Sequence, residues 1–169
     1  MNRYGTSSWL DPRVVVASSS IEGQGLFARA SIEADEVVIR LGGEVLTDDE
    51  FRARRLVKYS ALAIDDHLNL LLGDDSPVNF GNHSCDSSLW MADEVTLVAR
   101  RRIEAGEEIT VDYALHTADL PWSMACRCGS PVCRGVVTND DWRRRDVQER
   151  YAGHFSPFLN RRIASSGGR

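Results

Sequence analysis

Short runs of β-branched and aliphatic residues, separated by Gly, Asp and Pro, fill the chain from Arg13 to Val111. These runs are VVVA, EVVIR, ALAI, EVTLVA and ITV, and they begin at Val14, Glu36, Ala61, Glu94 and Ile109. Apolar runs of this length between turn-forming residues are typical of strands. The pattern therefore predicts a mostly β domain with short strands.

Two segments have the composition of helices. Thr47 and Glu50 have the spacing of a capping box, and the segment from there through Tyr59 is rich in Arg, Leu and Ala. A second helix is expected after Thr138, where two aspartates suit the positive N-terminal end and Gly153 would end the helix. Both segments are predicted to be surface helices.

Composition and charge limit the classes of function that fit the chain. A length of 169 residues is enough for one compact domain with a real core. The formal charge of -5 provides no overall basic field, so nonspecific binding to nucleic acid or to an anionic membrane is not expected, and a basic substrate segment would be attracted instead. No stretch approaches the roughly 20 apolar residues that span a bilayer, and the start lacks the apolar core of a signal peptide. The expected location is the cytoplasm.

The chain contains four cysteines, Cys85, Cys126, Cys128 and Cys133. Three of them form the motif CRCGSPVC, a tight loop that can fold around a tetrahedral zinc ion when Cys85 supplies the fourth ligand. Disulfides and free thiols are the alternatives, and zinc is favoured because no secretion signal is present. Four thiolates leave no open coordination position, so the site would be structural and catalysis would take place elsewhere.

Three further segments complete a set of motifs. They are IEGQGLFA at residues 21–28, NFGNHSC at 79–85 and GEEITVDY at 106–113, and the Cys-x-Cys-x4-Cys loop follows them. In this order they resemble the SET-domain protein lysine methyltransferases, over about residues 13–135. The resemblance implies a mostly β SET (β-clip) fold with short helices, in which the second and third segments cross as a pseudoknot.

The same resemblance divides the chain into four parts. They are an N-terminal arm at residues 1–12, the SET domain at 13–116, a post-SET zinc loop at 117–136, and a C-terminal helix and tail at 137–169. The last part resembles the tail of small stand-alone bacterial SET proteins. It would either pack over the cofactor or form a dimer contact.

The resemblance also implies roles for individual residues. The expected cofactor is S-adenosylmethionine, and the residues that match its binding positions are Gln24, Gly25, Leu26, Tyr59, Asn82, His83 and Arg127. Tyr113 matches the catalytic tyrosine, Tyr59 matches a second tyrosine upstream, and Val111 with Tyr113 would line the channel for the substrate lysine. The implied reaction transfers a methyl group to the ε-amine of a lysine in a histone-like or other protein substrate.

The chemistry of the cofactor-binding candidates agrees with such roles, and each also has a simpler explanation. Gly23 and Gly25 bracket a loop after a strand, where backbone donors can approach a ligand. Alone, Gly-x-Gly is a common turn, and the rest of a dinucleotide fingerprint is missing. Asn82 offers both an amide and a carbonyl, while His83 offers its backbone to a ligand and its ring to a structural hydrogen bond. A hydrogen-bonded pair in the core is the alternative.

Tyr113 follows Asp112 in an expected strand, so their side chains should face opposite ways, one anchoring the structure and the other entering the channel. The Tyr113 hydroxyl would hold the donor methyl and the target amine in line. Burial beside a positive sulfonium would lower the pKa of the amine, so a dedicated base is unnecessary. Val111 stands where many members have Phe or Tyr, so the channel is expected to accept methylated amines and not to stop at monomethyl-lysine.

Several positions depart from the family pattern. Ser87 and Ser88 stand where a proline and an asparagine are usual, and Asn79 stands where an arginine is usual, which changes the local hydrogen bonding. Two other functions are weighed. One is a binding module that has lost turnover, against which the retained Tyr113 argues, and the other is a methyltransferase for another amine, which a wider channel at Val111 would permit. The other histidines and the tryptophans are expected to have structural roles.

Overall fold

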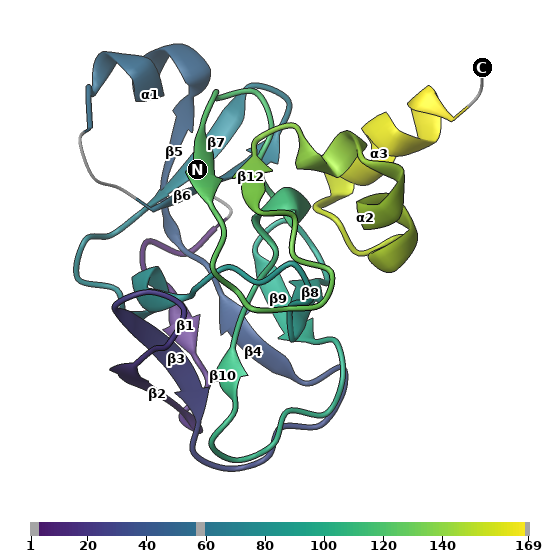
Figure 1. The fold of residues 1–169 in the computed structure, drawn as a ribbon. Coiled ribbons are helices and arrows are strands. Elements are labelled where there is room, and N and C mark those ends of the chain that lie inside the picture. The colour runs from purple at the N-terminus through teal and green to yellow at the C-terminus, as the bar shows by residue number, and fades with distance from the viewer. Residues whose placement is uncertain (1–3, 57–59, 168–169) are drawn as a thin grey trace.

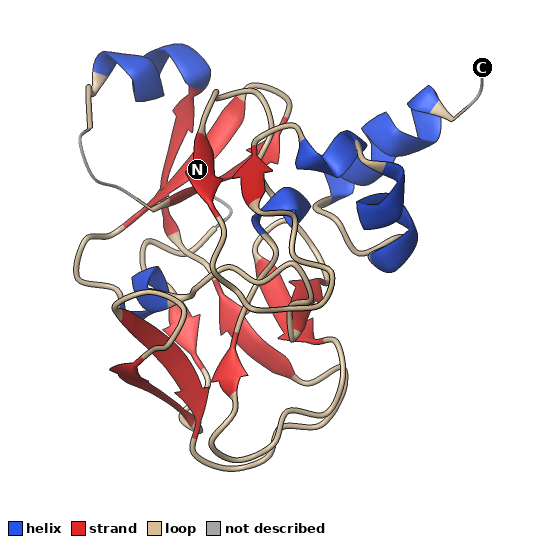
Figure 2. Ribbon diagram, viewed as in Figure 1, coloured by secondary structure: helices blue, strands red, loops and turns tan. Residues whose placement is uncertain are grey.

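The computed structural model describes residues 4–56 and 60–167 (Figure 1). Strands and loops make up most of this part of the chain, and the last three of its helices gather near the C-terminus (Figure 2). The mostly β fold with short helices that the sequence predicts is confirmed. Within these ranges, no helix is long and apolar enough to cross a membrane.

The strands and helices are short. The strands are β1 (Trp9–Leu10), β2 (Val14–Ser18), β3 (Gln24–Ala28), β4 (Val37–Arg40), β5 (Gly43–Thr47), β6 (Ala61–Asp65), β7 (Leu68–Leu72), β8 (Leu89–Met91), β9 (Thr96–Ala99), β10 (Glu108–Ile109), β11 (Ser123–Ala125) and β12 (Val136–Thr138). The α-helices are α1 (Asp48–Ala53), α2 (Arg145–Arg150) and α3 (Pro157–Ser166), and the 3-10 helices are η1 (Pro77–Phe80), η2 (Tyr113–Leu115) and η3 (Asp141–Arg143). Each of the five predicted apolar runs overlaps a strand, namely β2, β4, β6, β9 or β10.

The strands form small antiparallel sheets. Their orders are β1-β4-β9-β8, β10-β3-β2, β5-β7-β6 and β11-β12. Strands distant in the sequence pair with one another, as β4 does with β9 and β3 with β10. Sheets of two to four strands are marginal by themselves, so their stability depends on packing where the sheets meet.

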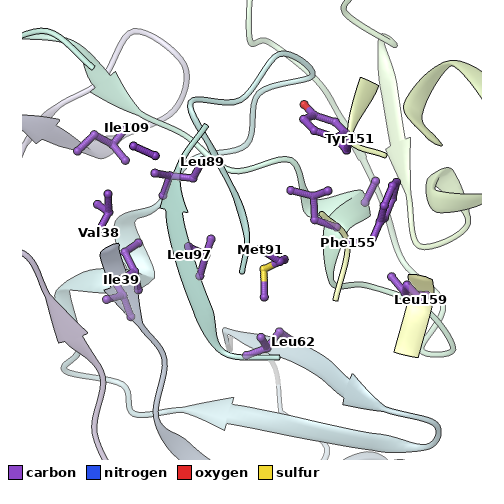
Figure 3. Close-up of a cluster of buried hydrophobic side chains, with 14 of the residues drawn as sticks. Val38, Ile39, Leu62, Leu89, Met91, Leu97, Ile109, Tyr151, Phe155 and Leu159 are labelled. Carbon is purple, nitrogen blue, oxygen red and sulfur yellow. The ribbon is translucent and has the colours of Figure 1, made fainter. Parts of the chain in front are cut away.

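The hydrophobic core joins the sheets to the C-terminal helices (Figure 3). Leu89 and Met91 of β8 and Leu97 of β9 belong to one cluster with Tyr151 and Leu159 from the C-terminal segment. All five side chains are at most 2% exposed. A fully buried large apolar side chain contributes about 1.5–3 kcal/mol, so the C-terminal segment is an integral part of the folded domain.

Helix α1 begins as predicted and ends earlier. The Thr47 hydroxyl accepts a hydrogen bond from the Glu50 N–H, and the Glu50 carboxylate accepts one from the Thr47 N–H, so the capping box is present. The helix ends at Ala53, shortly before Arg55, whose left-handed φ of 50° cannot continue it. Tyr59, to which the prediction extended the helical segment, lies outside the described residues.

The helix predicted after Thr138 and before Gly153 is present only in part, as α2. The chain forms η3 and then α2, and the two are separated at Arg144, where ψ is 132° and the backbone is extended. Gly153, with φ of 80°, does end this region. Helix α3 follows, and Pro157 occupies its first turn.

Residues 9–12 are not a free N-terminal arm, which corrects the predicted boundary. Strand β1 pairs with β4, so that Trp9 lies opposite Arg40. Asp11 is buried, and its carboxylate accepts hydrogen bonds from the guanidinium of Arg13. A strand of two residues is too short to produce a periodic pattern, and for this reason the sequence does not reveal it.

Candidate active site

Two segments that are distant in the sequence meet at the centre of the fold. Val111 forms parallel bridges with His83 and with Leu89. Its N–H donates to the carbonyl of Asn82 at 3.1 Å. The segment that ends at Tyr113 therefore lies between the segment of His83 and that of Leu89, the arrangement expected if the second and third motifs cross.

Tyr113 begins the 3-10 helix η2 and is not part of a strand, which corrects the prediction. The Asp112 carboxylate caps this helix by accepting a hydrogen bond from the Ala114 N–H at 3.0 Å. Asp112 is fully buried, whereas Tyr113 lines a pocket and donates its hydroxyl proton to the carbonyl of Gly81 at 2.9 Å. Burial raises the pKa of Tyr113 to about 12, so the hydroxyl stays protonated at neutral pH.

The pocket beside Tyr113 has a volume of about 330 Å³. Its lining comes from β4, β6, β7, β9 and β11 and from the crossing, and it includes both predicted channel residues, Val111 and Tyr113. The rings of His116 and Trp122 lie with their centroids 5.9 and 6.0 Å from that of Tyr113. Among the described lining residues there is no carboxylate, lysine or arginine. The described lining of the pocket is therefore mostly apolar and uncharged, with aromatic rings on one part of its wall.

Two polar atoms of the lining, Asn79 Oδ1 and His116 Nδ1, are buried and have no hydrogen-bond partner within the described ranges. Burial lowers the pKa of His116 to about 4, so its ring is neutral at physiological pH. Such a lining suits an apolar group that carries a polar atom. Ser60 also lines the pocket, and the predicted site residue that precedes it, Tyr59, lies outside the described residues.

Several of the residues predicted to bind S-adenosylmethionine lie in β3 or contact it. Gly25 lies inside this strand and not in a loop, which corrects the prediction. The Asn82 amide donates to the carbonyl of Gln24 at 3.0 Å and to Glu108 Oε1 at 2.9 Å. Leu26 is fully buried in the core, so its side chain holds the strand in place. The structure thus brings Gln24, Gly25 and Asn82 together.

Arg127 reaches the same region from the cysteine loop. Its guanidinium lies 3.4 Å from the carboxylate of Glu22, just before β3. Both side chains are exposed, so the ion pair adds little stability. The contact places the cysteine loop beside the start of β3, where the other cofactor-binding candidates lie.

The substitution Gly25→Ala is expected to weaken binding of S-adenosylmethionine by about tenfold, or about 1.4 kcal/mol. A Cβ at this position would lie 2.2 Å from Glu108 Oε1 and 3.1 Å from Asn82 Nδ2. The Glu108 side chain would have to turn away and would lose its bonds to Asn82 and Ser19. Isothermal titration calorimetry measures the effect. Gly73→Ala is the matched control, since its Cβ would meet nothing within 4 Å, and equal affinities for Gly25→Ala and wild type would refute the prediction.

The four cysteines form one cluster. Their Sγ atoms all lie within 4.8 Å of one another, and Cys85 Sγ is 3.8 Å from Cys126 Sγ. A tetrahedral zinc ion with ligands at about 2.3 Å places its sulfurs roughly 3.8 Å apart. All four are free thiols and none is in a disulfide. Burial raises the pKa of Cys85 to about 11, so a thiolate at this position requires a nearby cation.

Hydrogen bonds to the sulfurs also fit a metal centre. Cys85 Sγ accepts the backbone N–H of Arg134 at 3.3 Å, and Cys133 Sγ accepts that of Gly135 at 3.4 Å. Donors aimed at ligand atoms are usual around bound metals, where they stabilise the thiolate charge. The donor set, its spacing and its hydrogen bonds therefore all fit zinc.

His83 connects the cysteine cluster to Tyr113. Its buried ring accepts a hydrogen bond at Nδ1 from the Tyr113 backbone N–H, at 3.2 Å, and its Nε2 lies 3.3 Å from Cys85 Sγ. Burial lowers the pKa of His83 to about 4, so the neutral ring carries its proton on Nε2 and donates it to the sulfur. The ring has the structural role considered from the sequence, and the backbone of His83 remains for a ligand.

Arg134 is a site residue that the sequence reasoning misses. Its guanidinium is 1% exposed and bonds the two carboxylate oxygens of Asp112 at 2.7 and 2.8 Å and one oxygen of Asp141 at 2.7 Å. Its place directly after Cys133 is the only signal of its importance, because arginine is abundant throughout the chain.

Ser87 and Ser88, which depart from the family pattern, are buried and hydrogen bonded. The Ser87 hydroxyl donates to the carbonyl of Leu89 at 2.8 Å, and its N–H donates to the Tyr151 hydroxyl at 3.2 Å. The Ser88 hydroxyl accepts the Thr110 N–H at 3.0 Å. These contacts satisfy the local backbone despite the substitutions.

Most of the remaining aromatic residues have the structural roles expected of them. Trp142 is in the core, and His154 stacks on Trp90 at a centroid distance of 3.4 Å. His67 is exposed and contacts a neighbouring carboxylate. Trp122 differs from these, because it forms part of the pocket wall.

A family model for the SET domain matches residues 23–114, more than half of the chain. The chain belongs to the SET domain family. The chain is 29% identical over 137 residues to "Histone-lysine N-methyltransferase, H3 lysine-36 specific" of Candida albicans, covering 72% of this chain and 16% of that protein. It is 31% identical over 132 residues to "Histone-lysine N-methyltransferase ash1" of Drosophila melanogaster, covering 69% of this chain and 6% of that protein. The chain thus spans less than a fifth of the length of these curated relatives.

A solved structure shares the fold. It is the methyltransferase domain of the human histone-lysine N-methyltransferase SETMAR, with a TM-score of 0.60 and 21% sequence identity. The match covers 75% of this chain and 58% of that one.

Proposed function

We propose that this chain is a protein-lysine N-methyltransferase that uses S-adenosylmethionine. The observation that carries the proposal is the protonated hydroxyl of Tyr113 on the wall of an uncharged, mostly apolar pocket. The SET domain of this chain is similar to that of proteins named histone-lysine N-methyltransferases, which favours a lysine in a protein as the substrate.

The donor is proposed to bind at β3 and the adjoining crossing. The residues proposed to hold it are Gln24, Gly25, Leu26, Asn82, His83 and Arg127. When bound, S-adenosylmethionine supplies a methyl group on a positively charged sulfonium. Tyr59 stays a prediction from the resemblance, both as a cofactor contact and as a second catalytic tyrosine.

Tyr113 is proposed to orient the reacting groups. Its hydroxyl is fixed by the carbonyl of Gly81, and its buried position keeps it a neutral hydrogen-bond donor and acceptor. The pocket has no carboxylate in its described lining to stabilise an ammonium ion, so the amine enters preferentially without its extra proton. The neutral amine would then attack the methyl carbon in one step: the N–C bond forms as the C–S bond breaks, and the demethylated thioether leaves as a neutral molecule, with orientation as the main contribution of the protein.

A zinc ion is proposed to occupy the cysteine cluster, with Cys85, Cys126, Cys128 and Cys133 as its ligands. Cys85 belongs to the crossing, whereas the other three belong to the loop between β11 and β12. The ion would hold that loop, and the β11–β12 pair that flanks it, against the crossing. Four protein ligands leave no position for a substrate, so the role is structural.

Methyl transfer to a panel of lysine-containing peptides tests the proposal. Zinc-loaded protein is incubated with methyl-labelled S-adenosylmethionine, with the peptides and, separately, with small amines. Label on lysine supports the proposal. Donor binding without transfer would instead favour a silent binding module, label on a small amine alone would favour a different amine substrate, and absence of donor binding would exclude both methyltransferase functions.

Val111 is expected to permit more than one methylation per lysine. Its small side chain lines the pocket beside Tyr113, so a methylated amine has room to turn for a second transfer. Mass spectrometry of a good peptide substrate should show dimethyl- or trimethyl-lysine with wild type, and Val111→Phe should shift the product towards monomethyl-lysine. Only the mono form with wild type, or a higher methylation state with Val111→Phe, would be inconsistent with this steric explanation.

A further inference from the structure

Arg134 joins three parts of the molecule that the sequence keeps apart. It follows Cys133 in the cysteine loop, and its backbone N–H donates to Cys85 Sγ at 3.3 Å. Its guanidinium binds Asp112, the residue that caps the turn of Tyr113, at 2.7 and 2.8 Å. One residue therefore contacts both the cysteine cluster and the carboxylate beside Tyr113.

Stability alone is a poor explanation for this cluster. The side chains of Arg134 and Asp112 are 1% and 0% exposed, and removing two charges from water costs several kcal/mol per ion before their attraction offsets it. Apolar side chains of similar size would often stabilise such a site equally well. What the ion pair adds is direction, because a planar guanidinium that binds both oxygens fixes the orientation of the carboxylate.

The orientation of Asp112 is transmitted to Tyr113 over a short path. Asp112 Oδ1 accepts both a guanidinium N–H of Arg134 and the backbone N–H of Ala114, the residue after Tyr113. A tilt of the carboxylate would loosen the first turn of η2. The same turn aims the Tyr113 hydroxyl at the carbonyl of Gly81, so its direction depends on Arg134.

We propose that Arg134 is a positioning residue for methyl transfer, which holds the Tyr113 turn in its productive orientation and ties it to the cysteine loop. The inference rests on the proposed function of Tyr113. It assigns Arg134 no contact with the donor or with the substrate amine.

Arg134→Lys tests the proposal, since lysine keeps the charge and loses the planar fork. The expected result is a fall in kcat of about tenfold to 100-fold, the size of effect that small misplacements of reacting groups produce, with the Kd for S-adenosylmethionine within about threefold of wild type. Zinc content, measured by mass spectrometry of the metal, should stay at the wild-type level. Unchanged kcat in the folded, zinc-loaded variant would overturn the proposal.

A readout that does not depend on activity comes from NMR spectra of protein carrying ¹³C-labelled tyrosine. In Arg134→Lys, the Tyr113 ring signal should shift or broaden as its bond to Gly81 loosens, while the signal of Tyr151 stays in place. An unchanged Tyr113 signal would overturn the proposal even if activity fell. If wild type methylates nothing, the proposed function fails, and the Tyr113 signal still decides whether Arg134 positions that ring.

Two further variants keep the test decisive. Arg145→Lys is the matched control, because Arg145 forms an exposed pair with Glu149 and should leave kcat and the Tyr113 signal unchanged. If Arg134→Lys does not fold, Asp141→Asn removes the oxygen that accepts the third bond of the guanidinium, while Oδ1 can still accept the Thr138 hydroxyl and both bonds to Asp112 remain. It should move the Tyr113 signal in the same direction and lower kcat by a few-fold, and its failure to do both would overturn the proposal.

Discussion

Replacing Tyr113 by phenylalanine is expected to lower kcat for methyl transfer by about 100-fold or more, with the Kd for S-adenosylmethionine changed by less than about threefold. The substitution removes one hydroxyl and leaves the ring that packs against His116 and Trp122. The lost group is the hydroxyl that donates to the Gly81 carbonyl, and burial, which raises its pKa to about 12, keeps it protonated well above neutral pH. Single-turnover kinetics with labelled donor, together with calorimetric donor binding, measure the two effects separately.

Tyr151→Phe is the matched control for this substitution. Tyr151 is another buried tyrosine, and its hydroxyl bonds Ser87 and the carbonyl of Cys85 away from the pocket lining. Its loss should cost about 1–2 kcal/mol of the free energy of unfolding, with kcat of the folded protein retained. If Tyr113→Phe kept more than a tenth of the wild-type kcat, Tyr113 would not be the orienting residue, and another pocket group would have to take that role.

The sequence predicts those strands that carry a run of β-branched residues, such as VVVA in β2 and TLVA in β9. It does not reveal β3, because two glycines around Gln24 are typical of a loop. In the structure Gly25 is required in a strand, where Asn82 and Glu108 occupy the space of a side chain. Strands β11 and β12 have three residues each, too few for a periodic pattern, and their pairing becomes visible only in three dimensions.

Some features of the candidate site can likewise be predicted from the sequence, and others cannot. The cysteine motif predicts that Cys85 joins the other three cysteines, the resemblance to SET-domain enzymes implies that Val111 and Tyr113 line one channel, and the structure brings both groups together. The Asn82 amide shows the limit of such reasoning. It donates to the backbone of β3 and to a carboxylate, so part of its hydrogen-bonding capacity organises the site.

The network around Arg134 lies beyond sequence reasoning for a different reason. Its partners Asp112 and Asp141 come from separate segments. From the sequence, Asp112 is explained as a residue of an expected strand, and Asp141 as a residue near the N-terminus of an expected helix. Charged residues are common in the chain and are usually exposed, so neither residue type nor spacing marks the few that are buried. Only the tertiary arrangement shows that the cysteine loop and the Tyr113 turn share one buried arginine.

Removal of zinc is expected to lower the rate of methyl transfer by about 100-fold or more before the domain unfolds. Three proposed ligands lie in the loop between β11 and β12, and β11 with the residue before it supplies Met124 and Trp122 to the pocket wall. Without the ion, this loop would move away, and the pocket and the start of β3 would be exposed to solvent. The main core is built from residues of the other sheets and the C-terminal helices, so it should persist.

Titration with a chelator separates these two events. Activity and S-adenosylmethionine binding should decline together with zinc release, while far-UV circular dichroism and a cooperative thermal transition remain. Added zinc should restore activity, since the thiols stay reduced and the core stays folded. Loss of the thermal transition in step with zinc release would show instead that the ion stabilises the whole domain. In that case Cys85, at the crossing itself, would act as a staple for the core and not only for the loop that covers the site.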